Sequence, residues 1–197
     1  MKRLVLPTED DLSLRRLLQV RLSAGAVLML PTDTIYGLSC RADSKRAIAK
    51  IFAIKRRPSD RPLLVLVSSL SMAQKFCRLN RRQVVALKNI WSQPRPTTVL
   101  LPHRGYLPSN LTAGSPNLAV RLPKSIFLRK MIRALGVPLV STSANFSGQE
   151  VLSVEMALNI FKGQIGPEIV VEARSKPTRA SRLVLLGQDG RQQVLRK

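Results

Sequence analysis

Short apolar runs alternate with amphipathic segments along most of this 197-residue chain, and this alternation narrows the choice of folds more than any other feature. The runs have the length of β-strands and are bounded by turn-forming residues. We predict strands at residues 26–30, 62–67, 97–101, 118–122, 137–140, 169–171, 182–186 and 192–195. The last two are expected to pair as a hairpin across Asp189 and Gly190, because Asp-Gly is a typical hairpin turn.

Apolar residues at helical spacing lie between these strands. The first helix is expected to begin at a capping box of Thr8 and Asp11 and to end at Gly25. Further helices are predicted at residues 45–57, 71–77, 81–91, 125–135 and 153–161. Strands alternate with helices at first and pair locally later. The pattern therefore predicts a single α/β domain over residues 1–197, with a twisted mixed β-sheet and flanking helices.

Basic residues far outnumber acidic ones. The chain has 33 Lys and Arg against 11 Asp and Glu, which gives a formal net charge of +22 with histidine neutral. Between Arg61 and Gln149 there are thirteen Lys and Arg and no acidic residue. This excess favours a partner rich in phosphate, either a nucleotide or a nucleic acid. A solvated basic surface is the alternative interpretation.

The cellular compartment is inferred from three features that the sequence lacks: a disulfide framework, a secretory signal and a transmembrane helix. Two cysteines, Cys40 and Cys77, indicate no disulfide framework. The N-terminus, MKRLVLPTEDDL, has no long apolar segment of the kind that a secretory signal needs. No apolar stretch is long enough for a transmembrane helix. We therefore expect a protein of the reducing cytoplasm.

Several common active-site designs are excluded. The single histidine, His103, and two cysteines do not supply a usual zinc site. The patterns GxGxxG, GxxxxGK[ST] and GxSxG do not occur. His103 lies in a loop-like PHRG segment without triad partners, so we interpret it as a surface residue. An enzyme of this composition would rely on cations, hydroxyls and backbone amides, which suit phosphates and developing negative charge.

Polar residues stand beside apolar runs in three segments, namely PTDTIYG at 31–37, KRRP at 55–58 and STSAN at 141–145. In an α/β sheet the strand ends gather along one edge, where ligands bind. Ser141, Ser143 and Asn145 are expected to project to one side if the strand continues, because side chains alternate along it. Lys55 and Arg57 are expected across the cleft. Taken singly, each segment also reads as a turn, a helix end or a local cap.

Together, PTDTIYGL, KRRPSDRPL, AVRLP and STSANFSG resemble the YrdC-type threonylcarbamoyl-AMP synthase (TsaC) family over nearly the whole chain. The resemblance implies a YrdC-like fold with a basic cavity and no additional C-terminal domain. It implies synthesis of L-threonylcarbamoyladenylate from L-threonine, bicarbonate and ATP, with Mg²⁺ and release of pyrophosphate. A partner complex would then transfer the threonylcarbamoyl group to an adenosine of tRNA, next to the anticodon.

The resemblance also implies roles for individual residues. The catalytic and ATP-binding residues match the family's Lys-x-Arg and Ser-x-Asn pairs and are Lys55, Arg57, Ser143 and Asn145, with Arg196 as a further ATP ligand. The residues expected to bind threonine are Thr34, Arg121, Ser141 and Ser181. An arginine suits the threonine carboxylate because its guanidinium binds carboxylates in a bidentate manner. No protein metal ligand is implied, since Mg²⁺ takes oxygen ligands largely from substrate phosphates.

Three positions depart from the family pattern. Leu66 replaces a histidine of the longer members, Arg61 replaces a common asparagine, and Arg95 stands in place of a glycine in the segment that follows Trp91. The main alternative is an RNA-binding module of the same fold without synthase activity. The basic stretch supports that alternative, but an aromatic content of 4% argues against base stacking. A paralogue with another carbamoyl-transfer reaction is a third reading, although Arg121 and Asn145 favour the synthase.

Overall fold

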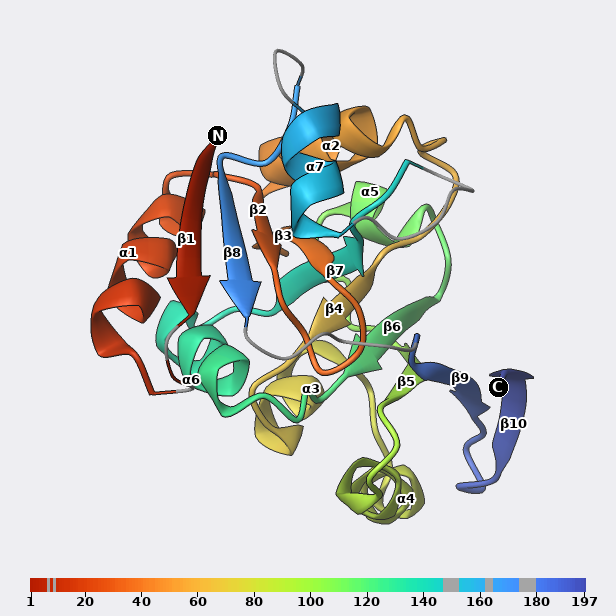
Figure 1. Ribbon diagram of the computed structural model, residues 1–197. Helices are drawn as coiled ribbons and strands as arrows, with labels where there is room; N and C mark the ends of the chain where they lie inside the picture. The colour runs from red at the N-terminus through yellow and green to blue at the C-terminus, as the bar shows by residue number, and fades with distance from the viewer. Residues whose placement is uncertain (7, 9, 147–152, 162–164, 174–179) are drawn as a thin grey trace.

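A mixed β-sheet runs through the computed structural model, which is described for residues 1–197 except 7, 9, 147–152, 162–164 and 174–179 (Figure 1). The strands of the described part are β1 (Lys2–Leu6), β2 (Leu28–Leu30), β3 (Gly37–Arg41), β4 (Leu64–Leu66), β5 (Thr97–Pro102), β6 (Asn117–Arg121), β7 (Leu139–Ser143), β8 (Ile169–Ala173), β9 (Arg182–Leu186) and β10 (Gln192–Arg196). Their order across the sheet is β1-β8-β2-β3-β7-β4-β6-β5-β9-β10. Ser147 to Gln149, which end the STSANFSG segment and the acid-free stretch, lie outside the described residues.

The sheet contains both parallel and antiparallel pairs, as the sequence predicts for a mixed sheet. The pairs β1–β8, β8–β2, β4–β6 and β5–β9 are parallel. The pairs β2–β3, β3–β7, β7–β4, β6–β5 and β9–β10 are antiparallel. The central strands β3, β7 and β4 therefore bring together segments that lie far apart in the sequence.

The helices begin at side-chain caps where the sequence supplies them. They are α1 (Leu12–Ser23), α2 (Lys45–Lys55), α3 (Leu70–Phe76), α4 (Arg81–Ser92), α5 (Ser109–Thr112), α6 (Ile126–Leu135) and α7 (Val154–Ile160). The expected capping box at Thr8 is wrong, because Asp11 itself caps α1 and accepts a hydrogen bond from the backbone N–H of Leu14 at 2.7 Å. Helix α2 ends earlier than predicted, because Arg56 adopts the left-handed conformation at φ 49°.

Alternation along the strands divides the core into two parts. Leu38, Val65 and Val140 face the larger part, which includes the apolar side of α2. Leu66 and Leu139 face the smaller part, which α1 and α6 cover. Helices α1 and α6 pack against each other near β1 and β8 (Figure 1). The same face of the sheet continues across β7, β4, β6 and β5, where it carries the candidate site instead of a helix.

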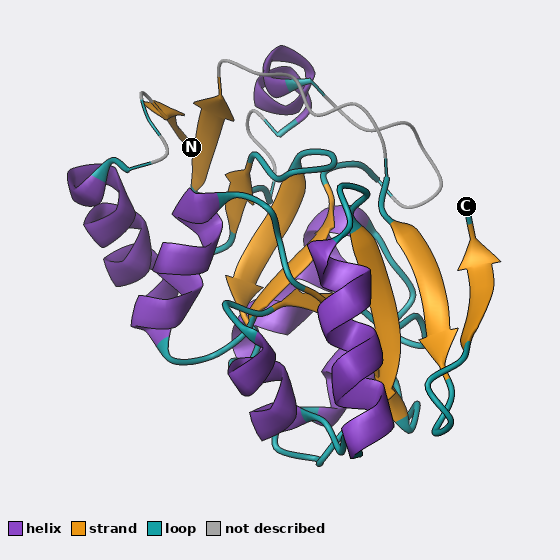
Figure 2. Ribbon diagram, turned by 90° about the horizontal axis from the view of Figure 1, so that it is seen from below, coloured by secondary structure: helices purple, strands orange, loops and turns teal. Residues whose placement is uncertain are grey.

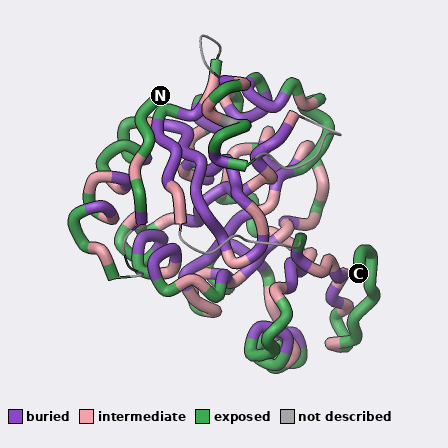
Figure 3. Tube along the Cα trace, viewed as in Figure 1, coloured by how far each residue is buried: buried purple, intermediate pink, exposed green. Residues whose placement is uncertain are grey.

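The two edges of the sheet are its most exposed strands. Strand β10 is exposed at every residue, and β1 is exposed along most of its length (Figure 3). They lie at opposite ends of the sheet, as the view from below shows (Figure 2). In β10 the register shifts between Val194, which pairs with Val184, and Arg196, which pairs with Leu183. Leu195 is therefore the extra residue of a β-bulge, a feature that redirects side chains at sheet edges.

Candidate functional site

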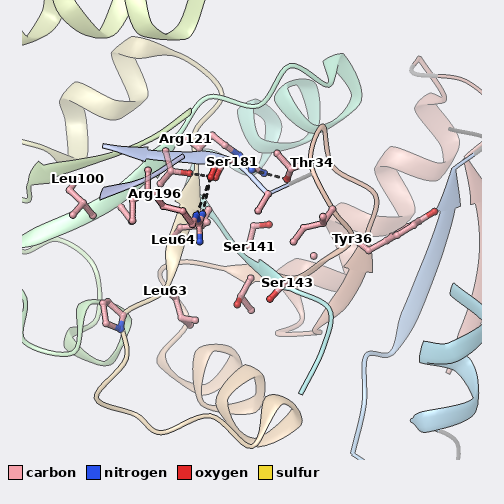
Figure 4. Close-up of a pocket in the computed structure, with 18 of the residues that line it drawn as sticks. Thr34, Tyr36, Leu63, Leu64, Leu100, Arg121, Ser141, Ser143, Ser181 and Arg196 are labelled. Atoms are coloured by element: carbon pink, nitrogen blue, oxygen red, sulfur yellow. Dashed lines mark hydrogen bonds between the residues drawn. The ribbon is translucent and has the colours of Figure 1, made fainter. Parts of the chain in front are cut away.

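A cavity of about 570 Å³ opens on the face of the sheet that α1 and α6 leave uncovered (Figure 4). Its floor comes from strand residues that share this face, among them Leu64, Leu100, Ala119 and Leu183. Its polar lining consists mostly of residues that the sequence predicts for the site, namely Thr34, Arg57, Arg121, Ser141, Ser143, Ser181 and Arg196. No carboxylate is among the lining residues that the structure describes, so the cavity suits anionic ligands.

One end of the cavity, which we call the closed end, consists of Thr34, Arg121 and Ser141. Their exposed fractions are only 3%, 3% and 4%. Arg121 Nη1 donates a hydrogen bond to Thr34 Oγ1 at 2.8 Å, and Figure 4 shows the two side chains pointing toward one another. Burial lowers the pKa of Arg121, and nearby Asp33 partly opposes this effect. An arginine nevertheless stays charged in a protein, so the closed end contains a buried cation.

Asp33 is the acidic residue beside Arg121, and it offsets only part of the positive charge of the guanidinium. Its Oδ1 atom is 3.6 Å from Arg121 Nη2, close enough for an ion pair but too far for a hydrogen bond. Its Oδ2 atom accepts a hydrogen bond from the backbone N–H of Lys124 at 3.0 Å. Both Asp33 Oδ1 and Arg121 Nε are buried and have no hydrogen-bond partner among the described residues. Arg121 therefore keeps donor capacity for a ligand.

The hydroxyl of Thr34 is held by a short chain of hydrogen bonds. Thr32 Oγ1 donates to the carbonyl of Ile35 at 2.7 Å and lies 2.8 Å from Thr34 Oγ1. Because the Thr32 proton is used in this way, Thr34 donates to Thr32 and accepts from Arg121. The PTDT segment therefore fixes the rotamer of Thr34 and the direction of the two hydrogen bonds that its hydroxyl makes.

Gly37 provides the space for the hydroxyl of Ser141. A Cβ atom added at Gly37 would lie 2.7 Å from Ser141 Oγ, a distance that real Cβ atoms do not show. Gly37 pairs with Ser143 on the neighbouring strand, and Ser39 pairs with Ser141. The prediction that Ser141, Ser143 and Asn145 project to one side is confirmed for the two serines, which lie two positions apart in β7 and both line the cavity. It is wrong for Asn145, because β7 ends at Ser143 and Asn145 is not a lining residue.

The more accessible part of the polar lining, which we call the open end, consists of Arg57, Ser143 and Arg196. Arg57 is half-buried, and its Nη2 donates to the carbonyl of Pro62 at 3.1 Å. Arg196 is exposed and donates to the carbonyl of Ser181 through Nη2 at 2.9 Å and Nε at 3.3 Å (Figure 4). The bulge at Leu195 places Arg196 on the face of its partner Leu183, so its guanidinium faces the cavity.

Ser181 lies between the two ends. It is buried, and its hydroxyl is 2.8 Å from the hydroxyl of Thr98. Tyr36 and Gly37, which belong to the predicted segment PTDTIYG but received no role of their own, also line the cavity, and so does Thr98, which we did not single out in the sequence. The alternation of side chains in β5 is a signal for Thr98, because Val99 and Leu101 point to the core. The close packing at Gly37 leaves no comparable signal in a single sequence.

Lys55 and Asn145 meet near the cavity but are not among its lining residues. Lys55 Nζ donates to the Ser143 carbonyl at 2.5 Å, the Asn145 carbonyl at 2.9 Å and Asn145 Oδ1 at 2.6 Å. Ser143 Oγ donates to the same Asn145 Oδ1 at 2.7 Å. The structure thus brings the lysine of the Lys-x-Arg pair and both members of the Ser-x-Asn pair into one network.

The three positions that depart from the family pattern are not among the lining residues of the cavity. Leu66 is fully buried beside Arg121 in the β4–β6 pair and does not line the cavity. Arg61 and Arg95 are exposed, and the carbonyl of Arg61 is 3.4 Å from Arg57 Nε. His103 is held by Gly105 N–H and the Ser115 carbonyl at 3.0 Å each, away from the cavity.

The described residues contain no group of three His, Cys, Asp or Glu side chains that could hold a metal ion. None of the helices within those ranges is long and apolar enough to cross a membrane.

Comparisons with known proteins find relatives that match most of the chain. The family model Sua5–YciO–YrdC, described as "Telomere recombination", matches residues 21–197. A threonylcarbamoyl-AMP synthase of Neisseria gonorrhoeae is 30% identical over 181 residues, which cover 91% of this chain and 94% of that protein. The synthase of Pseudoalteromonas translucida is 33% identical over 147 residues, or 74% of this chain and 79% of its own length.

Solved structures show the same fold. Sua5 of P. abyssi complexed with L-threonine has a TM-score of 0.80 and 26% identity, over 94% of this chain and 54% of that one. The chain thus spans about half the length of that protein. YciO of E. coli has a TM-score of 0.82 at 20% identity, over all of this chain and 94% of YciO, and this likeness concerns the fold alone.

Proposed function

The chain belongs to the Sua5–YciO–YrdC family, and from this premise we propose that it is a threonylcarbamoyl-AMP synthase. Its reaction would combine L-threonine, bicarbonate and ATP into L-threonylcarbamoyladenylate and release pyrophosphate. One observation carries the proposal. A buried arginine at the closed end and two more accessible arginines at the open end face the same cavity, and the lining residues that the structure describes include no carboxylate.

The closed end suits an amino acid. Arg121 would bind the carboxylate, because a guanidinium offers two parallel donors and its Nε is not used within the described chain. The hydroxyls of Thr34, Ser141 and Ser181 are small polar partners for the remaining groups of threonine. P. abyssi Sua5, a relative of 26% identity, has been solved with L-threonine bound, which supports this choice of amino acid.

The open end suits the triphosphate. Arg57 and Arg196 would carry the positive charge there, with the hydroxyl of Ser143 beside them. Each arginine is held by a backbone carbonyl and keeps further N–H groups for a ligand. Mg²⁺ would enter with ATP as part of the substrate, since the described cavity lining offers it no carboxylate.

The chemical step joins two anions. The amine of threonine and bicarbonate form a carbamate with loss of water. A carbamate oxygen then forms a bond to the α-phosphorus of ATP while the bond from this phosphorus to the pyrophosphate oxygen breaks. The arginines of the open end would reduce the repulsion between the anions and stabilise the charge on the leaving group. The product is expected to serve tRNA modification next to the anticodon through a partner complex.

The decisive test is synthesis by the purified chain. We expect pyrophosphate and threonylcarbamoyladenylate when ATP, MgCl₂, bicarbonate and L-threonine are all present, as measured by liquid chromatography and mass spectrometry. Reactions without bicarbonate or without threonine serve as controls. Failure to form the adenylate with either threonine or serine would reject the proposal.

A second candidate function, RNA binding without synthesis, is supported by the net charge of +22. Binding through phosphates would weaken steeply with salt, by a slope of roughly −0.7 per phosphate contact for a single strand. Fluorescence anisotropy with a labelled tRNA from 50 to 300 mM KCl would measure that slope. Salt-independent binding, or no binding, would contradict this candidate.

A further inference from the structure

The ammonium group of Lys55 is completely used within the chain. Its side chain is 1% exposed, and its Nζ atom lies within 3 Å of three oxygens at the end of β7. A lysine ammonium carries three hydrogens, so the two backbone carbonyls and the amide oxygen account for all of them. Direct binding of a phosphate, the role that the resemblance implies, would require one of these bonds to break.

The three partners are neutral, which is unusual for a buried cation. Lys55 forms no ion pair with any described carboxylate, and burial, with a contribution from Arg57, lowers its pKa to about 8. Burying a charge without a counter-ion is costly unless strong hydrogen bonds compensate it. Such bonds are present here, because three oxygens from residues almost ninety positions away converge on one nitrogen. If the ammonium were removed, the Ser143 carbonyl, the Asn145 carbonyl and Asn145 Oδ1 would lose the donor that they share.

The hydrogen bonds link the buried Lys55, through Asn145, to Ser143, which lines the cavity. Asn145 Oδ1 accepts from Lys55 at 2.6 Å and from the Ser143 hydroxyl at 2.7 Å. Ser143 lines the cavity, whereas Lys55 and Asn145 do not. The carbonyl of Ser143 is also a Lys55 acceptor, so the lysine holds both the backbone and, through Asn145, the side chain of Ser143.

We propose that Lys55 is a positioning residue that fixes the chain from Ser143 to Asn145 and thereby the direction of the Ser143 hydroxyl, without touching the nucleotide itself. The nucleotide role of Ser143 rests on the proposed function. In this arrangement Arg57 contacts the phosphates, whereas Lys55 holds the part of the cavity wall that presents the Ser143 hydroxyl as an acceptor to the nucleotide.

A double-mutant cycle tests this division of roles. MgATP affinity is measured by calorimetry for the wild type, Lys55→Met, Ser143→Ala and the double variant. The Ser143 hydroxyl gives its proton to Asn145, so it would accept a hydrogen bond from the nucleotide. If Lys55 acts through Ser143, each single variant and the double variant weaken binding by about the same factor, roughly fivefold for one neutral hydrogen bond. Independent contacts would instead multiply to roughly 25-fold in the double variant, and this result would overturn the proposal.

The cycle includes its own controls. Lys50→Met removes a lysine from the same helix, where Lys50 bonds to the carbonyl of Gly25, and it should leave MgATP affinity unchanged. A wild-type protein that does not bind MgATP would contradict the proposed function. Additive effects in a protein that does bind it would contradict only the positioning role.

A second experiment needs neither a ligand nor a Lys55 variant, so it applies even where Lys55→Met fails to fold. Reductive methylation followed by mass spectrometry should modify exposed Lys88 and leave Lys55 unmodified in the free wild type. In Asn145→Ala, which removes one acceptor, Lys55 should become reactive. Modification of wild-type Lys55 at the rate of Lys88, or no change in Asn145→Ala, would overturn the proposal.

Discussion

The two ends of the cavity present the same functional group in opposite ways. At the closed end, Arg121 is buried, bonded to a threonine hydroxyl and accompanied by an aspartate. At the open end, Arg57 and Arg196 are more exposed and are bonded to backbone carbonyls. A buried, pre-oriented guanidinium gives geometric selectivity, whereas exposed cations give charge that salt can screen. We therefore expect discrimination between substrates at the closed end and charge stabilisation at the open end.

The largest effect is expected from Arg121→Lys, which keeps the charge but removes the bidentate geometry. We expect kcat/KM for threonine to fall by about a hundredfold or more, mostly through KM, because a lysine does not replace a bidentate arginine. Initial rates at varied threonine would measure this, and the KM for ATP should change little. Near-normal threonine kinetics would remove the basis for a selective closed end.

Gly37→Ala alters the closed end without changing its charge. The new methyl group would meet Ser141 Oγ, so we expect a loss of about 1–3 kcal/mol in unfolding free energy and a higher KM for threonine. Urea denaturation and initial rates are the measurements. Adding Ser141→Ala removes the clashing oxygen, so the double variant should regain stability but not threonine affinity. Equal stability of Gly37→Ala and the wild type would contradict the steric argument.

Arg57→Ala and Arg196→Ala examine the open end. Each should raise the KM for ATP by roughly tenfold at low salt, as expected for a lost charge-assisted hydrogen bond. The loss should shrink as KCl is raised toward 0.5 M, because salt screens exposed charges. The Arg121→Lys defect should be insensitive to salt. Equal salt responses at both ends would remove the distinction between them.

The smallest effect concerns Lys55, a buried cation that has no carboxylate partner among the described residues. Its pKa of about 8 in the folded protein lies below the ordinary value of 10.5. Between these values the unfolded chain binds more protons than the folded chain, so this group makes stability rise with pH. Urea midpoints at pH 7, 9 and 10 should show that Lys55→Met gains less, or loses more, than the wild type as pH increases. Parallel pH profiles would show that the pKa is not depressed.

Much of the fold follows from local signals. The helices at 81–92 and 126–135 begin at Asn80 and Ser125, and each cap accepts a hydrogen bond from the helix. Strand β1 has no such signal, because its residues are mostly exposed and its pairing with β8 spans the whole chain. Helix α5 was missed because a single turn of four residues has no apolar period.

Part of the candidate site could likewise be predicted and part could not. The residue types predicted that three polar segments gather at one edge of the sheet, and the family resemblance implied which arginines and hydroxyls meet in one cavity. Neither was enough to show which side of the cavity wall each residue lies on. Lys55 and Arg57 are two positions apart, yet one is enclosed behind Ser143 and the other faces the ligand space. That difference depends on where β7 ends relative to α2, which is a tertiary contact.

The bulge in β10 has a consequence for changes in chain length. Val194 and Arg196 already pair with consecutive residues of β9, so the loss of Leu195 would restore a regular ladder and leave Arg196 opposite Leu183. An added residue at the same place would have to be absorbed by a wider bulge, or it would turn the guanidinium to the opposite side of the sheet. This edge should therefore tolerate a one-residue deletion better than a one-residue insertion, although both change the length of the same exposed strand.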